Sequence, residues 1–425
     1  MRTFLLTPAV ALWLLLLSFA AAGAAPAEQP AKALLYPDPF VEQVLQRNAM
    51  IRAREAGHDA AVARITSAGA LDDPMVSYVS APETFGTMMG YRQNIQVSQR
   101  IPWPGTLTLR SEAARADADS AEYKVADIRL KLAAQARATY ADWYYVHRAI
   151  AINKATITIV ERLKSVAAAA YASGQAPEQD VLQAEVELTR LQNQSLELEQ
   201  RRRAVQAQIN NLLNADPDSL VGAPDALPTP PFLMAYAELE AAALAQYPAL
   251  KSLDATVAAN RERVEVARKG FYPNITLMAG ENTLMSPASM QPSVGIAINI
   301  PISGMHEGEL DMAHANLRQS ESELIAAQSQ LLSDLDATCA GVQQARDTID
   351  LYDKRLVPLA GLNLKAAESD YRTGAGDFLK LITAEQQDLM VELEQERARA
   401  DLYTRLAALD YETGGAVFTN LESKP

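Results

Sequence analysis

The sequence contains little of what enzymes and metal sites are built from. Its 425 residues include one cysteine and four histidines, and aromatic residues make up 6%. The single cysteine, Cys339, excludes an intrachain disulfide and a paired-cysteine metal site, so we expect it to serve as a small packing residue. The sequence has no G-x-S-x-G motif and no Cys–His pair in a catalytic pattern. We therefore expect no enzyme activity and no cofactor.

Two groups of residues resemble metal ligands at first sight. His306 and His314 flank three acidic residues, but eight positions on a helix separate them by about 12 Å, too far to share one ion. A solvated helix start is the better interpretation of this segment, and we predict no metal site. Methionines gather near the predicted strands, where thioethers suit Cu(I) or Ag(I) but equally serve as lipid-facing packing. They are Met75, Met88, Met89, Met278, Met285 and Met290.

Positive charge is also scarce, since 38 basic residues face 52 acidic ones and the formal net charge is −14. Such a balance argues against a nucleic-acid partner. Long apolar runs are confined to the N-terminus, where Arg2, the run at 9–17 and Ala22-Gly23-Ala24 predict a signal peptide over 1–24. Later segments lack the roughly 20 apolar residues of a membrane-spanning helix. Insertion into a membrane would therefore require a closed β-barrel.

Residues 106–172 contain neither proline nor glycine. A helix over that range would be about 100 Å long, far beyond an ordinary globular helix. The corresponding range later in the chain, 305–373, carries Pro358, which should kink or break the helix there.

An internal repeat organises the whole chain. Y-A-S-G at 171–174 recurs as Y-R-T-G at 371–374, an offset of 200 residues (171 to 371), and each copy is followed by A-E. I-P-W-P-G at 101–105 is matched by I-P-I-S-G at 300–304, an offset of 199 residues (101 to 300). The order and spacing of these landmarks indicate a tandem duplication.

Each half is predicted to contain a helix (38–70 and 233–270), two short strands with a loop between them, and two long helices. The strands are expected over 75–81 and 92–101, and over 274–280 and 293–300. The chain is predicted to consist of a signal peptide (1–24), a first repeat (25–214), a proline-rich linker (215–231), a second repeat (232–413) and a C-terminal tail (414–425). The first repeat is expected to have a β-hairpin at 75–101 and long helices at 106–172 and 177–214. The second is expected to have a β-hairpin at 274–300 and long helices at 305–373 and 376–413.

Four strands per chain cannot close a barrel, and an open sheet edge is not tolerated in lipid. A homotrimer would supply twelve strands and close that edge. Aromatic residues near the strands would suit a membrane-interface belt. They are Tyr78, Tyr91, Trp103, Phe271 and Tyr272. The alternative is a small soluble sheet that caps a helical stalk.

These features resemble the TolC-type outer-membrane efflux proteins. The resemblance rests on the two-fold repeat, on Q-x-I-P-W-P-G at 99–105 and on the Y-x-x-G turns, and covers about 38–413. It implies an α+β membrane protein in the outer membrane of a Gram-negative bacterium, with a trimeric twelve-stranded barrel continuous with a periplasmic barrel of coiled-coil-like helix pairs. It also implies a homotrimer in outer-membrane lipid, working with a periplasmic membrane-fusion adaptor and an RND-type inner-membrane pump. The I-P-W-P-G junction is most similar to the CzcC/CusC-like branch, which exports heavy-metal cations; drug or organic-solute efflux and type I secretion are the alternatives.

The resemblance places adaptor docking at the helix-turn tips, around Gly174, Gly374, Leu182 and Ile382. Glycine also has a structural use at a helix C-terminus. A periplasmic gate is expected among Tyr171, Tyr371, Glu178, Asp180, Asp377 and Lys380. The tyrosines could close the tips or simply pack there.

The acidic residues near the tips could form cation-attracting rings in a trimer, or stabilise helix N-termini. The family places two inward aspartates one turn apart on the last helix. Here Lys380 and Thr383 occupy those positions, and Asp180 is the first-repeat equivalent of Lys380. An Asp180–Lys380 ion pair is therefore a candidate replacement for the aspartate gate. The remaining alternative for the whole protein is a periplasmic coiled-coil adaptor or structural stalk.

Overall fold

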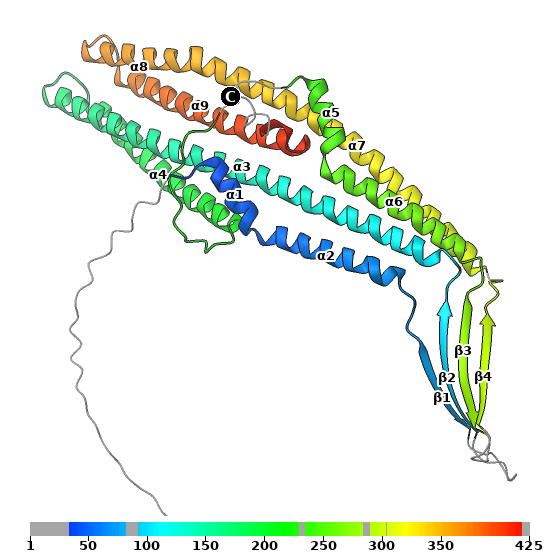
Figure 1. Cartoon of the computed structure of the whole chain (residues 1–425). Coiled ribbons are helices and arrows are strands. Elements are labelled where there is room, and N and C mark those ends of the chain that lie inside the picture. The colour runs from blue at the N-terminus through cyan, green and yellow to red at the C-terminus, as the bar shows by residue number, and fades with distance from the viewer. Residues whose placement is uncertain (1–33, 82–91, 229–233, 284–289, 303, 419–425) are drawn as a thin grey trace, which may run out of the picture.

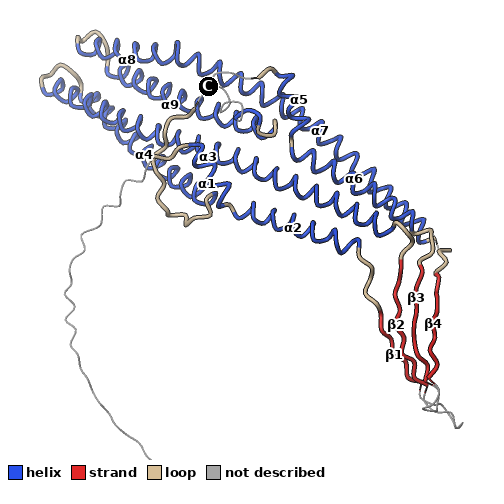
Figure 2. Tube along the Cα trace, viewed as in Figure 1, coloured by secondary structure: helices blue, strands red, loops and turns tan. Residues whose placement is uncertain are grey.

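The computed structural model describes residues 34–81, 92–228, 234–283, 290–302 and 304–418. A four-stranded sheet lies at one end of an elongated molecule. The turns at 173–177 and 373–377, each of which connects two long helices, lie at the other end (Figures 1 and 2). The predicted signal peptide, the loop at 82–91 and half of the loop expected at 281–292 (residues 284–289) lie outside the described residues. None of the described helices is long and apolar enough to span a membrane.

The helix expected at the start of each repeat is two helices. In the first repeat α1 (Pro37–Arg47) ends at Asn48, whose side chain accepts a hydrogen bond from Met50 N (2.9 Å) and begins α2 (Ala49–Gly69). In the second repeat α5 (Tyr236–Gln246) ends before Pro248, the first residue of α6 (Pro248–Lys269). The residue before a proline avoids the helical conformation, and Tyr247 is extended at ψ 115°. Both interruptions correct the prediction of one continuous helix.

The long helices carry most of the length of the molecule. α3 (Thr106–Ala172) has 67 residues and covers the range without proline or glycine. It returns through α4 (Glu178–Leu212), and in the second repeat α7 (Met305–Leu351) and α8 (Val357–Arg372) return through α9 (Phe378–Glu412).

Pro358 neither breaks its helix nor ends it. The residues just before it, Tyr352–Leu356, form a π-helical turn, η1, that joins α7 to α8. Proline cannot donate to the carbonyl four residues earlier and its ring crowds that carbonyl. The wider π turn relieves the conflict while the helix continues.

The sheet runs in the order β1 (Met75–Ala81), β2 (Arg92–Ile101), β3 (Ile275–Thr283) and β4 (Met290–Ile298), antiparallel throughout. The β2–β3 pairing joins the two repeats, with Val97 opposite Ala279 and Ile101 opposite Ile275. β3 is longer than predicted and β4 begins earlier and ends earlier. Pro292 lies inside β4, where an edge strand tolerates it.

The core lies around the middle of the helices, where the proline-rich segment packs onto α3. Trp143 donates from Nε1 to the carbonyl of Gly222 (2.9 Å), and the Tyr140 hydroxyl donates to the carbonyls of Leu35 and Asp225 (3.0 Å each). Both ring side chains are fully buried. The described part of the predicted linker is therefore held against the core by hydrogen bonds from α3.

The start of the predicted tail is also packed. The Asp410 carboxylate accepts from the backbone nitrogens of Val417 and Phe418 (3.0 Å each) and from Arg137 (2.9 Å). The Arg137 guanidinium in turn lies over the Phe418 ring, at 3.9 Å from its centroid. This buried carboxylate ties the C-terminal end of α9 to the residues that follow.

Candidate functional site at the helix tips

Glycine makes both tip turns possible. Gly174 and Gly374 each adopt φ 76°, a left-handed conformation that other residues enter at a cost. Each glycine nitrogen donates to the carbonyl of the tyrosine three residues earlier, at 2.9 Å for Tyr171 and 3.2 Å for Tyr371. Each turn needs its own glycine for its shape, whatever else that glycine does.

The two tips are joined by Tyr371. Its hydroxyl donates to Asp180 Oδ2 (3.0 Å), and its ring packs edge-on against Phe378 with centroids 5.3 Å apart. Burial, and then the hydrogen bond to Asp180 and its charge, raise the pKa of Tyr371 to about 12. The phenol is thus a neutral donor at neutral pH, and the contact links the second repeat to the first.

The Asp180–Lys380 ion pair predicted from the sequence does not form within the chain. Asp180 faces Tyr371 instead, while Lys380 lies exposed beside Asp370 and Gln387 in a separate groove between α8 and α9. The Lys380 backbone nitrogen donates to the Asp377 carboxylate (2.8 Å), which caps α9. The offset of 200 identified matched positions correctly, but matched positions do not have to touch.

Equivalent tip residues have different surroundings in the two repeats. Tyr171 is 48% exposed, whereas Tyr371 is half-buried. Leu182 is 58% exposed, but Ile382 is only 6% exposed because it packs in the cluster that holds the two hairpins together. Ile382 therefore offers almost no surface for docking. Glu178 is exposed in the first turn of α4.

A buried carboxyl pair, which was not predicted from the sequence, lies next to this cluster. Glu385 is 2% exposed, and its Oε2 has no hydrogen-bond partner among the described residues. Glu187, 4% exposed, accepts from Gln386 Nε2 (2.6 Å) and lies 3.8 Å from the Arg190 guanidinium. Burial, and then the charges of Glu187 and Asp388, raise the pKa of Glu385 to about 8. The A-E repeat was a signal, but Glu185, its first-repeat counterpart, is exposed and pairs with a lysine.

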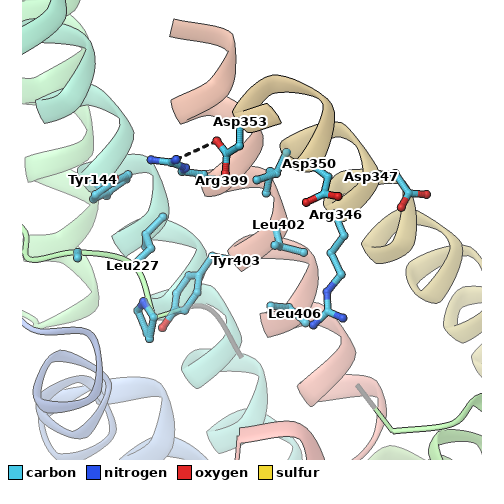
Figure 3. Close-up of a pocket in the computed structure, with 13 residues that line it drawn as sticks. Tyr144, Leu227, Arg346, Asp347, Asp350, Asp353, Arg399, Leu402, Tyr403 and Leu406 are labelled. Carbon is cyan, nitrogen blue, oxygen red and sulfur yellow. Dashed lines mark hydrogen bonds and ion pairs between the residues drawn. The ribbon is translucent and has the colours of Figure 1, made fainter. Parts of the chain in front are cut away.

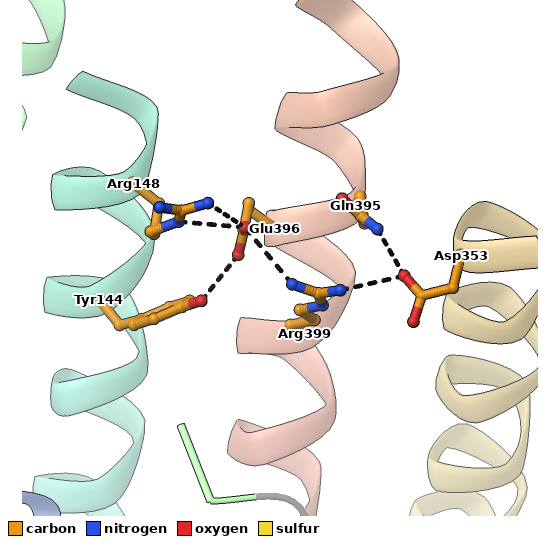
Figure 4. A network of polar contacts seen from close by, with 6 residues as sticks. All are labelled: Tyr144, Arg148, Asp353, Gln395, Glu396 and Arg399. Carbon is orange, nitrogen blue, oxygen red and sulfur yellow. Dashed lines mark hydrogen bonds and ion pairs between the residues drawn. The ribbon is translucent and has the colours of Figure 1, made fainter. Parts of the chain in front are cut away.

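A second polar network connects the hairpins near the π turn (Figure 4). Glu396 is 2% exposed and accepts from Tyr144 (2.9 Å) and from two nitrogens of Arg148 (3.0 and 2.9 Å). Arg399 reaches from Glu396 (3.5 Å) to Asp353 in the π turn (3.0 Å). The network therefore ties α3 and α9 to η1.

A cavity of about 610 Å³ opens beside this network (Figure 3). Its walls include Tyr144 and Tyr403, the Asp353 carboxylate and residues 226–228 of the proline-rich segment. The described end of that segment thus forms part of a wall between the helices.

The proposed interface aromatics occupy two different places. Trp103 and Tyr272 stack with centroids 5.0 Å apart where the strands meet the helices, and Trp103 N donates to Asn274 Oδ1 (3.2 Å). Tyr78 is 60% exposed in the middle of β1, not at its end. Tyr91 lies outside the described residues. Among the described residues, two of these rings stack at the strand-to-helix junction.

The described part of the chain holds no group of three or more His, Cys, Asp or Glu side chains that could bind a metal ion. His306 Nδ1 lies 3.4 Å from Glu309, and Met75 is 66% exposed on β1. Met88, Met89 and Met285 fall outside the described residues. Cys339 is partly buried in the helical core, and burial raises the pKa of its thiol.

Comparison with known proteins decides the family. The profile of the outer membrane efflux proteins matches residues 40–215 and again residues 239–415. The chain belongs to the outer membrane efflux protein family. It is accordingly an outer-membrane efflux channel protein, and the two matches fall on the two halves of the repeat.

Solved structures share the fold of this efflux protein. The outer-membrane channel OprN is 19% identical, with a TM-score of 0.78 over 89% of this chain and 90% of its own. The outer membrane protein VceC from Vibrio cholerae is 18% identical, with a TM-score of 0.76 over 89% and 96%. CusC is 17% identical, with a TM-score of 0.76 over 89% and 92%. No curated protein matches the chain by sequence. The similarity to CusC is no stronger than the others, so these structures do not single out a branch of the family.

Proposed function

We propose that three copies of this efflux protein close one twelve-stranded barrel in the outer membrane of a Gram-negative bacterium. The observation that supports this most directly is the sheet. In the described part of the chain β1 and β4 each pair on one side only. Both edge strands carry exposed apolar side chains, including Val76, Val294 and Ile296. Open edges with apolar flanks are unstable in lipid and in water, and closure by two further copies removes them.

In this arrangement the helices continue the barrel into the periplasm, and their tips form its inner entrance. The tip residues Tyr371 and Asp180 hold adjacent hairpins together and would keep the entrance narrow. Opening would separate the phenol from the carboxylate. Once the tips have separated, Glu178, three copies of which surround the axis of a trimer, would raise the local cation concentration at the entrance. The remaining tip residues proposed from the sequence, Tyr171, Asp377 and Lys380, belong to the same rim.

The turns at Gly174 and Gly374 are proposed as the docking points of a periplasmic membrane-fusion adaptor, which would connect the duct to an RND-type inner-membrane pump. Leu182, exposed just beyond the first turn, supports this role. Ile382 does not, because it is buried within the chain.

We propose heavy-metal cations as the exported substrates. The support is the resemblance of the I-P-W-P-G junction at 101–105 to the CzcC/CusC-like branch, together with the net charge of −14. The channel itself would conduct passively, and the pump would select the substrate.

Heat-modifiability and crosslinking of the detergent-extracted outer-membrane fraction test the assembly. A trimer confined to that fraction is the expected result. A monomer or dimer in the soluble periplasmic extract would replace the duct with a stalk or adaptor. Sensitivity of a deletion strain to metal salts then tests the substrate, with sensitivity to organic drugs alone overturning the metal proposal.

A further inference from the structure

Two grooves at the tips are built from equivalent residues of the two repeats. The first-repeat groove, of about 730 Å³, is lined from its own repeat by residues that include Val166, Ala170, Gln175, Ala176, Pro177 and Asp180. The second-repeat groove, of about 440 Å³, is lined by residues that include Ala366, Asp370, Ala375, Gly376, Asp377 and Lys380. Each member of the second set lies 200 positions after a member of the first. The internal duplication has therefore placed six matched positions in the linings of both grooves.

The two grooves differ in whether the other hairpin contributes to their lining. Tyr371 and Phe378 of the other hairpin line the first-repeat groove, with the phenol bonded to Asp180. The residues that line the second-repeat groove all come from α8, α9 and the turn between them. Within the described chain, then, the first hairpin contributes nothing to the second-repeat groove.

The residues equivalent to Tyr371 and Phe378 are Tyr171 and Glu178. Both are exposed, and neither side chain has an ion pair, ring contact or hydrogen bond to another described residue. Lys380, the counterpart of Asp180, is exposed in the open groove and likewise forms no ion pair within the described chain. The chain therefore displays an open groove and the two side chains that its own symmetry matches to that groove.

We propose that Tyr171 and Glu178 of one copy occupy the second-repeat groove of the next copy, with Glu178 paired to Lys380. The inference rests on the proposed oligomer and specifies its contact at the tips. Charge supports the match. Within the chain an apolar ring, Phe378, accompanies an acid; between copies an acid, Glu178, would meet a base. The contact joins two different surfaces, so its repetition builds a ring when the rotation closes.

A cysteine pair tests this contact in the full-length protein in its membrane. Glu178→Cys and Lys380→Cys are combined in a Cys339→Ser background and oxidised with copper phenanthroline. We expect covalent dimers and trimers on a non-reducing gel, and neither from either cysteine alone. A pair that yields only monomer bands, in a protein that still crosslinks as a trimer through its lysines, overturns the inference. Loss of the trimer in the unsubstituted protein would instead overturn the proposed function.

Charge reversal provides an independent measurement. Lys380→Glu places two acids together at each of three contacts, and we expect roughly a tenfold rise in the open fraction of single channels. Adding Glu178→Lys should restore the original open fraction. The matched control is Lys365→Glu, at an exposed position of α8 outside the groove, which should leave the open fraction unchanged. A double variant as open as the single one contradicts the pairing.

Discussion

Substitution of Tyr371 by phenylalanine tests whether the tip contact keeps the channel closed. The variant loses the hydroxyl that donates to Asp180 at 3.0 Å but retains the ring that packs on Phe378. A hydrogen bond to a charged group contributes about 1.5 kcal/mol or more, and the half-exposed position of Asp180 favours the lower end of that range. Three such contacts in a trimer give about 4.5 kcal/mol, so opening should become easier by a factor on the order of a thousand.

Single-channel recording of the purified trimer in planar bilayers measures this directly. We expect Tyr371→Phe to increase the open fraction strongly, while Tyr236→Phe, an exposed tyrosine at the start of α5, has no effect. Asp180→Ala combined with Tyr371→Phe should add little to either change alone, because both remove the same bond. An open fraction that does not change in Tyr371→Phe would refute the assignment of this bond as a closing contact.

Three further predictions concern stability. The raised pKa of Glu385 means that its stabilising contribution is complete below pH 4.5 and is lost as the pH rises towards about 8. Glu385→Gln should therefore flatten the fall of the thermal unfolding temperature between these pH values. Glu185→Gln, at the exposed equivalent position, should leave the pH dependence of the unfolding temperature unchanged. Gly374→Ala should lower the free energy of unfolding by about 1 kcal/mol because φ at this position is 76°. Gly57→Ala inside α2, where an added Cβ would meet no atom within 4 Å, should raise the free energy of unfolding by about 0.5 kcal/mol. Denaturant melts in which both substitutions change stability in the same direction would contradict this. Glu396→Ala removes a buried acceptor of three donors and should cost about 3 kcal/mol in the same melts, with less than about 0.5 kcal/mol arguing that the network is not stabilising.

The long helices and the strands of the first repeat were predictable because their signals are local. A stretch of 67 residues without proline or glycine specifies a helix, and α3 has those bounds. The alternating pattern gave β1 and β2 the ranges that the structure shows. The breaks at Asn48 and Tyr247 were missed because a single cap or proline inside an amphipathic pattern does not disturb its periodicity.

The site could be predicted only as a set of positions. The repeat identified Tyr371, Asp180 and Lys380 as members of matched motifs, but it could not say which would meet. That depends on how the second hairpin packs on the first, which places Tyr371 on Asp180 and leaves Lys380 in a separate groove between α8 and α9. Burial of Glu385 and exposure of Glu185 follow from the same packing.

The sequence by itself determined the duplication, the long helices and the presence of four strands. These signals are local: hydrophobic periodicity, glycines at turns, and the absence of proline from a long stretch each set the conformation of nearby residues. Only the tertiary structure decided that the two repeats join through β2 and β3 and that the proline-rich segment is hydrogen-bonded to Trp143. It also decided that one groove is lined by both hairpins while its counterpart is lined by the second hairpin alone. Two halves of one chain occupy unequal surroundings once they pack against each other, and equal motifs then acquire unequal partners.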